Sequence, residues 1–132
     1  MPPRPLSPTV WTSPQLAPGA LADLAASGVQ RIISNRPDGE DPGQPTAAEM
    51  EAAARQAGMT FDWIPVTGMP TAAQAAAVGD LLADGRPTVM FCRSGTRSAA
   101  AWALSERLRG ADADELRAAA AGAGYDFSRL PL

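Results

Sequence analysis

The stretch from Pro87 to Trp102 reads PTVMFCRSGTRSAAAW. Its first five residues are mostly apolar and typical of a buried strand, and its alanine-rich end is typical of a helix. A strand that passes directly into a helix is the repeating unit of α/β sheets. The single cysteine of the chain, Cys92, stands where the predicted strand ends.

The same alternation of strand and helix continues on both sides of this stretch. Strands are predicted within residues 9–13, 29–34, 59–66 and 87–91, and helices within 18–28, 46–58, 71–84, 98–110 and 111–124. We therefore expect one three-layer α/β/α domain over residues 9–132, with a mainly parallel central sheet. Half of residues 1–8 are proline, which predicts an irregular N-terminal arm.

Composition excludes several functional classes. The chain of 132 residues contains no histidine and one cysteine, so catalytic triads with histidine, histidine metal sites and internal disulfides are all excluded. Its net charge of −3 predicts no nucleic-acid partner, and no apolar run is long enough to span a membrane. The N-terminus does not resemble a secretory signal. We expect a cytoplasmic protein with a reduced thiol that needs no metal and no cofactor.

Cys92 is predicted to lie in an anion-binding loop. Ligands of open α/β sheets gather at the carboxyl ends of the strands, where Cys92 stands. Backbone N–H groups, the N-terminus of the next helix and arginine side chains converge there, and together they favour a nucleophilic thiolate. A lone cysteine is often only a small core residue, but a core position is not expected to precede two arginines and a glycine.

The loop CRSGTRS resembles the active-site loop of single-domain rhodaneses and the phosphate loop of tyrosine and dual-specificity phosphatases. Together with NRPDGE, residues 35–40, it more closely resembles the β-lactamase-hydrolase-like family over roughly residues 9–128. That family is described as small bacterial sulfur transferases or phosphatases. The resemblance implies a dual-specificity-phosphatase-like fold, with a rhodanese-like sheet as the alternative.

Three features favour sulfur transfer over phosphate transfer. Four residues separate Cys92 from Arg97, one fewer than in the phosphatases that the loop resembles, so that Ser98 stands where they have arginine. Phe91 replaces the histidine that usually precedes their cysteine. The loop after the strand DWIPV carries no aspartate to protonate a leaving oxygen. We therefore predict a thiosulfate sulfurtransferase with a persulfide on Cys92, whose partners are a small-molecule donor (thiosulfate or a persulfide) and a thiol acceptor such as glutathione.

Cys92 and Arg97 are the predicted catalytic residues. The predicted substrate-binding residues are Arg93, Ser94, Gly95, Thr96, Ser98, Asn35 and Arg36. For Asn35 and Arg36, a hydrogen-bonded turn is an equally weighted interpretation.

Two other functions remain open at this stage. The first is a phosphatase of the protein tyrosine or dual-specificity type that forms a phosphocysteine on Cys92, and the second is a non-catalytic anion-binding or redox-sensing module. A second copy of the chain is a further candidate partner.

Overall fold

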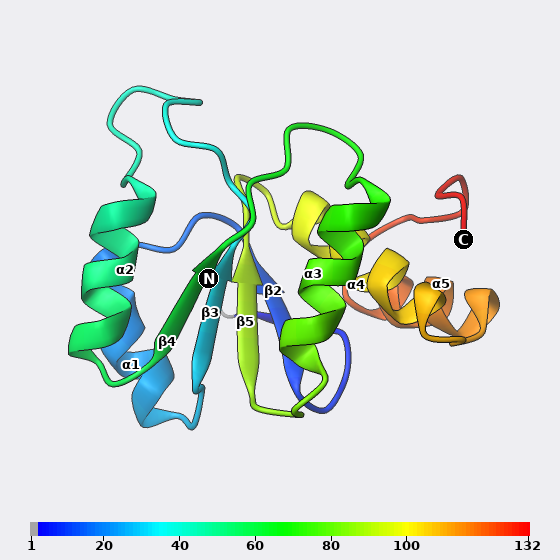
Figure 1. The fold of residues 1–132 in the computed structure, drawn as a ribbon, viewed down its shortest axis with the longest axis horizontal. Helices are drawn as coiled ribbons and strands as arrows, with labels where there is room; N and C mark the ends of the chain where they lie inside the picture. Colours follow the sequence, from blue (N-terminus) through cyan, green and yellow to red (C-terminus); the bar gives the residue numbers. More distant parts are fainter. Residues whose placement is uncertain (1–2) are drawn as a thin grey trace.

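The computed structural model describes residues 3–132, which form a five-stranded sheet between two layers of helices (Figure 1). The strands are β1 (Arg4–Pro5), β2 (Val10–Ser13), β3 (Arg31–Ser34), β4 (Thr60–Trp63) and β5 (Thr88–Phe91). The helices are α1 (Leu21–Ala26), which follows the 3-10 turn η1 (Pro18–Ala20), α2 (Ala47–Gln56), α3 (Ala72–Leu82), α4 (Thr96–Leu108) and α5 (Ala113–Gly122).

The sheet has the strand order β1-β2-β5-β3-β4. The pairs β2–β5, β5–β3 and β3–β4 are parallel, whereas β1 runs antiparallel to β2. The predicted three-layer α/β/α domain with a mainly parallel sheet is confirmed. The order places β4 at an edge, where Pro65 just beyond its end removes no ladder hydrogen bond.

One part of the N-terminal segment departs from the expected irregular arm. Arg4 and Pro5 pair with Thr12 and Trp11 of β2, and the next residue, Leu6, is buried in the core. A two-residue strand is too short to give an alternating pattern, and the surrounding prolines hide it in the sequence. Residues 1–2 of the predicted arm lie outside the described part of the chain.

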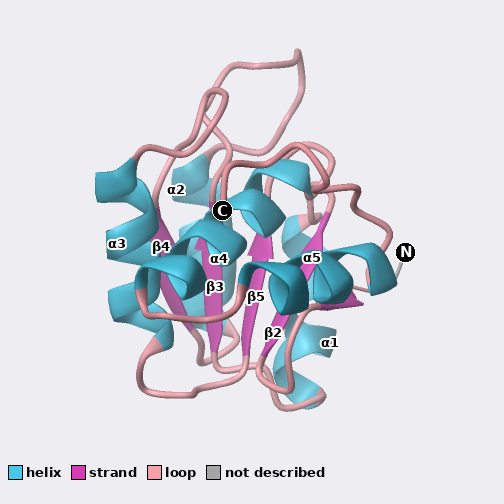
Figure 2. Ribbon diagram, turned by 90° about the vertical axis from the view of Figure 1, so that its right-hand side faces the viewer, coloured by secondary structure: helices cyan, strands magenta, loops and turns pink. Residues whose placement is uncertain are grey.

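Neighbouring residues of the central strands face opposite helical layers. Ile32 and Val89 pack with α1 and α2, while Ile33 and Met90 pack with α4 and α5. Successive side chains of a strand point to opposite faces of the sheet. Because both faces are covered by helices, consecutive residues of β3 and β5 are apolar. Figure 2 shows α3, α4 and α5 in front of the strands, so both faces of the sheet are covered.

The central strand β5 carries the predicted loop to the middle of the carboxyl edge. Its last residue, Phe91, accepts a hydrogen bond from the Asn35 N–H at 2.8 Å, just after the end of β3. On the other side, Cys92 donates its N–H to the carbonyl of Ser13 in β2 at 3.4 Å. The segments that follow β2, β3 and β5 therefore meet around Cys92.

Candidate active site

Cys92 is the first residue of the loop between β5 and α4, and its side chain is fully buried. The backbone N–H of Gly95 donates to Cys92 Sγ at 3.0 Å. A donor aimed at sulfur interacts more favourably with a thiolate than with a thiol. The loop therefore folds around the sulfur atom, which is the arrangement predicted for a nucleophile.

Gly95 has a backbone conformation that other residues rarely adopt. Its φ is 93°, and a Cβ atom placed on it would lie 2.5 Å from Tyr125 Oη. The Tyr125 hydroxyl itself hydrogen-bonds Thr12 Oγ1 at 2.9 Å. Glycine is thus required here both by the left-handed turn and by the closeness of the C-terminal segment.

The start of α4 differs from the starts of three other helices. The side chains of Thr46, Thr71 and Asp112 accept backbone hydrogen bonds at the N-termini of α2, α3 and α5, as is typical of threonine and aspartate at these positions. The residue in the equivalent position of α4 is Gly95, which has no side chain to form such a bond. The Thr96 N–H donates to Ser94 Oγ at 3.5 Å, and the N–H groups that follow it in the first turn of α4 are placed to bind an anion beside Cys92.

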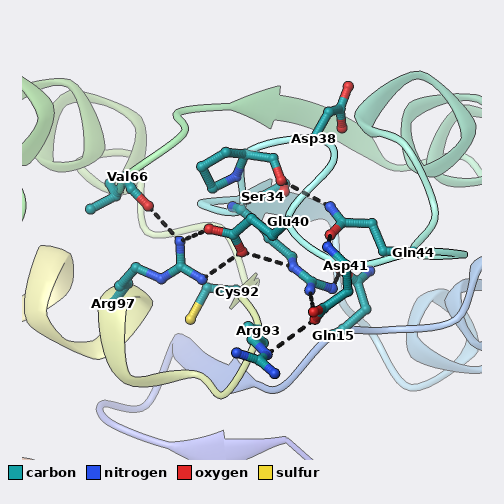
Figure 3. A network of polar contacts seen from close by, with 12 residues as sticks. Gln15, Ser34, Asp38, Glu40, Asp41, Gln44, Val66, Cys92, Arg93 and Arg97 are labelled. Carbon is teal, nitrogen blue, oxygen red and sulfur yellow. Dashed lines mark hydrogen bonds and ion pairs between the residues drawn. The ribbon is translucent and has the colours of Figure 1, made fainter. Parts of the chain in front are cut away.

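Arg97 lies in the first turn of α4, and two protein groups hold its guanidinium (Figure 3). Its Nη1 and Nη2 donate to the two carboxylate oxygens of Glu40 at 2.7 and 2.8 Å, and Nη1 also donates to the Val66 carbonyl at 2.6 Å. The Glu40 hydrogen bonds raise the pKa of Arg97 above its ordinary value, and the nearby Cys92 acts in the same direction. Arg97 is therefore a fixed positive charge close to the sulfur.

Glu40 is the centre of the charged network that Figure 3 shows. Hydrogen bonds from Arg97, with a smaller contribution from Arg36, lower the pKa of Glu40 to about 2, although partial burial opposes the shift. The Glu40 carboxylate is therefore ionised at neutral pH.

Arg36 is buried, with 5% of its surface exposed, and all three guanidinium nitrogens have protein partners. Nε donates to Glu40 at 3.0 Å, Nη1 to Gln15 at 3.0 Å and Nη2 to Asp41 at 2.6 Å. Its backbone carbonyl accepts from Trp63 Nε1 at 2.9 Å. Arg36 therefore fixes the loop after β3 from within, and its predicted contact with the substrate stays a prediction.

Asn35 and Ser98 contact each other rather than the mouth of the site. Ser98 Oγ donates to Asn35 Oδ1 at 2.8 Å, and Asn35 Nδ2 donates to the Ile64 carbonyl at 3.0 Å. Both side chains are completely buried. They tie α4 to the loops after β3 and β4 and so position these loops, and their roles in substrate binding stay predictions.

The remaining predicted residues lie at the surface of the loop. Arg93 is 68% exposed and pairs with Asp41 at 3.1 Å, and Ser94 Oγ donates to Thr96 Oγ1 at 3.2 Å. These three side chains are exposed on the loop that begins at Cys92. Their roles as ligand contacts stay predictions.

Four contributors to this network are not predicted from the sequence. In the sequence, Glu40 and Asp41 belong to a short acidic stretch that is typical of a turn. No sequence pattern marks Gln15 or the Val66 carbonyl as part of a site. The pairing of NRPDGE with CRSGTRS is the available signal, because the two motifs meet only if β3 and β5 are neighbours. No group of three or more carboxylate, thiol or imidazole residues within 3–132 is arranged to hold a metal ion.

Residues 3–109 match the family model described as beta-lactamase hydrolase-like protein, phosphatase-like domain. The chain belongs to this family. The beta-lactamase hydrolase-like protein of Xylella fastidiosa (strain Temecula1) is 38% identical over 110 residues, which is 81% of the chain. That of Agrobacterium fabrum (strain C58) is 41% identical over 90 residues, which is 66% of the chain. Those matches cover only 26% and 21% of the two relatives, so the chain spans about a quarter of their length.

Solved structures place the fold among phosphatases. A candidate phosphatase from Neisseria meningitidis Z2491 superimposes with a TM-score of 0.80 and 30% identity, covering 95% of this chain and 90% of that one. Two further structures share the fold. Kinase associated phosphatase has a TM-score of 0.70 and 16% identity, with 86% of this chain and 77% of that one covered. Human DUSP28 has a TM-score of 0.64 and 21% identity, with 94% of this chain and 83% of that one covered. The predicted dual-specificity-phosphatase-like fold is thus confirmed, and the chain is a phosphatase-like domain.

These comparisons contradict the predicted thiosulfate sulfurtransferase, because the family and the similar structures are phosphatase-like. The prediction relied on the short spacing from Cys92 to Arg97. In the structure, Ser98 at the longer spacing points inward to Asn35, while Arg97 reaches Glu40 and Val66 from the first turn of α4. Arg97 also lies close to Cys92, so the shorter spacing is compatible with an arginine beside the sulfur. The predicted persulfide, sulfur donor and thiol acceptor lose their support with it.

Among the described residues, no helix is both long and apolar enough to cross a membrane.

Proposed function

We propose that this domain is a phosphatase in which Cys92 attacks the phosphorus atom of a phosphate monoester. The observation that carries the proposal is the arrangement around Cys92 Sγ, which accepts the Gly95 N–H at 3.0 Å and lies beside the Arg97 side chain. The family supports it, as does kinase associated phosphatase, which was solved with its catalytic-site cysteine replaced by serine.

The reaction has two balanced steps. The Cys92 thiolate forms an S–P bond while the ester P–O bond breaks, and the departing oxygen keeps the bonding electron pair. Water then attacks the phosphocysteine, the S–P bond breaks, and phosphate and a proton are released while the thiolate is restored. Arg97 and the first N–H groups of α4 stabilise the negative charge on the phosphoryl oxygens in both steps.

Steady-state hydrolysis of p-nitrophenyl phosphate tests this proposal. We expect wild-type turnover and no turnover above background for Cys92→Ser. For Arg97→Lys we expect a loss on the order of a hundredfold, because lysine cannot form the bidentate pair with Glu40 that holds the positive charge beside the sulfur. Arg55→Lys is the matched control, since Arg55 forms an exposed pair with Glu51 on α2. Binding of phosphate with no turnover of any phosphate ester would contradict the proposal and favour the anion-binding module.

A further inference from the structure

The loop after β4 lies beside the site but supplies no acid. Residues 64–71 read IPVTGMPT and contain no carboxyl, imidazole, thiol or phenol group. The loop is nevertheless close, because the Val66 carbonyl accepts a hydrogen bond from Arg97. A phosphatase that protonates its leaving oxygen needs a protonated acid within hydrogen-bond reach of that oxygen.

The carboxylates on the neighbouring loops are already used as acceptors. Asp38 accepts the Ala47 N–H at 2.8 Å, Glu40 binds two arginines, and Asp41 binds Arg36 and Arg93. On the C-terminal side, Asp126 accepts the Ser128 N–H at 3.0 Å. For two of these residues the hydrogen bonds favour the ionised carboxylate: they lower the pKa of Glu40 to about 2 and that of Asp126 below its ordinary value.

Resting on the proposed function, we propose that the site acts on aryl phosphates whose phenols are acidic enough to depart without a proton from the protein. The Cys92 thiolate forms the S–P bond, the aryl P–O bond breaks, and the phenolate leaves with the electron pair. The phenolate later takes its proton from water. Alkyl phosphates such as phosphoserine are excluded as efficient substrates, because an alkoxide leaves poorly without an acid.

A cleft beside Arg97 offers room for the aromatic ring. It has a volume of about 340 Å³, and Thr96 and Arg97 line one side of it. Its apolar lining comes from the loop after β4 and from the C-terminal segment and includes Met69, Pro70, Phe127 and Leu130. Met69 is 57% exposed, so part of this apolar surface is open to a ligand. An aromatic leaving group buries this surface, and a small acyl phosphate does not.

The test is the dependence of kcat/KM on the leaving group, because kcat/KM includes every step up to departure of the phenol. We expect kcat/KM for substituted phenyl phosphates to fall several-fold for each unit by which the pKa of the phenol rises, with no detectable turnover of phosphoserine. A change of less than about twofold across the series, or efficient turnover of phosphoserine, would overturn this inference alone. No turnover of any phenyl phosphate would overturn the proposed function as well.

Four variants search for an acid among the nearby carboxylates: Asp38→Asn, Glu40→Gln, Asp41→Asn and Asp126→Asn. Each is assayed with the most and the least acidic phenol of the series, and the ratio of the two kcat/KM values is compared with wild type. The inference predicts an unchanged ratio for every variant, including Glu40→Gln, which lowers both values by releasing Arg97. The ratio is measured on one preparation, so partial unfolding cancels. A variant that loses activity mainly with the least acidic phenol would identify a general acid and overturn the inference.

A separate experiment tests whether the cleft binds the aromatic ring of the substrate. Met69→Ala is expected to lower kcat/KM for phenyl phosphates by several-fold and to leave that for acetyl phosphate unchanged, since the acetyl group is too small to fill the cleft. An equal effect on both substrates, or a preference of the wild type for acetyl phosphate over a phenyl phosphate of similarly acidic leaving group, would contradict it.

Discussion

At the residue scale, Gly95 combines a left-handed backbone conformation with a hydrogen bond to the sulfur of Cys92. In Gly95→Ala, the left-handed φ costs roughly 1–2 kcal/mol, and the new Cβ also meets Tyr125 Oη at 2.5 Å. Gly28→Ala is the matched control, because Gly28 has a φ of 108° and a Cβ added there would have no atom within 4 Å. Denaturant unfolding should show a larger loss for Gly95→Ala than for Gly28→Ala, and the double variant with Tyr125→Phe should recover part of the difference. Equal losses would show that contact with Tyr125 is unimportant.

At the element scale, the capping box of α3 also holds the loop beside the site. Thr71 Oγ1 accepts the Gln74 N–H at 3.1 Å, and Gln74 Nε2 donates to the Pro65 carbonyl at 2.8 Å. We expect Thr71→Ala to lower the free energy of unfolding by about 1 kcal/mol and also to lower kcat/KM, because the loop that includes Val66 loosens. Asp112→Ala removes the cap of α5 and should cost similar stability with activity retained. Equal losses of activity in the two variants would contradict a role for this loop.

The elements themselves are predictable because their signals are local. The caps at Thr46, Thr71 and Asp112 and the apolar runs of β3 and β5 each depend on residues only a few positions apart in the sequence. Strand order depends on pairings between distant segments, which no local pattern specifies. For the same reason the sequence predicts Cys92 and Arg97 for the site, but not the partnership of Arg97 with Glu40, 57 residues away.

At the scale of the whole molecule, two ionised carboxylates link stability to pH. Hydrogen bonds from Arg31 to Asp84, and from Arg97 to Glu40, lower both pKa values to about 2, from ordinary values of 3.8 and 4.5. The unfolded chain therefore binds more protons than the folded one between about pH 4.5 and pH 2, and stability falls as the pH falls through this window. Arg31 is buried, so Asp84→Asn leaves a buried charge without its ion pair.

Urea unfolding between pH 7 and pH 2 checks this linkage. The difference in unfolding free energy between wild type and Asp84→Asn should be largest above pH 4.5 and shrink toward pH 2. Asp80→Asn serves as the control, because Asp80 forms only an exposed 3.5 Å pair with Arg109 and should have little effect at any pH. A difference between wild type and Asp84→Asn that stays constant with pH would contradict the ion-pair explanation.

The central claim is that Cys92 forms a covalent bond to phosphorus. The most direct measurement is mass spectrometry of the protein quenched within the first turnover on p-nitrophenyl phosphate, with release of p-nitrophenolate followed in parallel. We predict a burst of one p-nitrophenolate per chain and one phosphoryl group on the peptide that contains Cys92, with neither in Cys92→Ser. Turnover by the wild type with no phosphoryl group on Cys92, or with the group on another residue, would contradict the account.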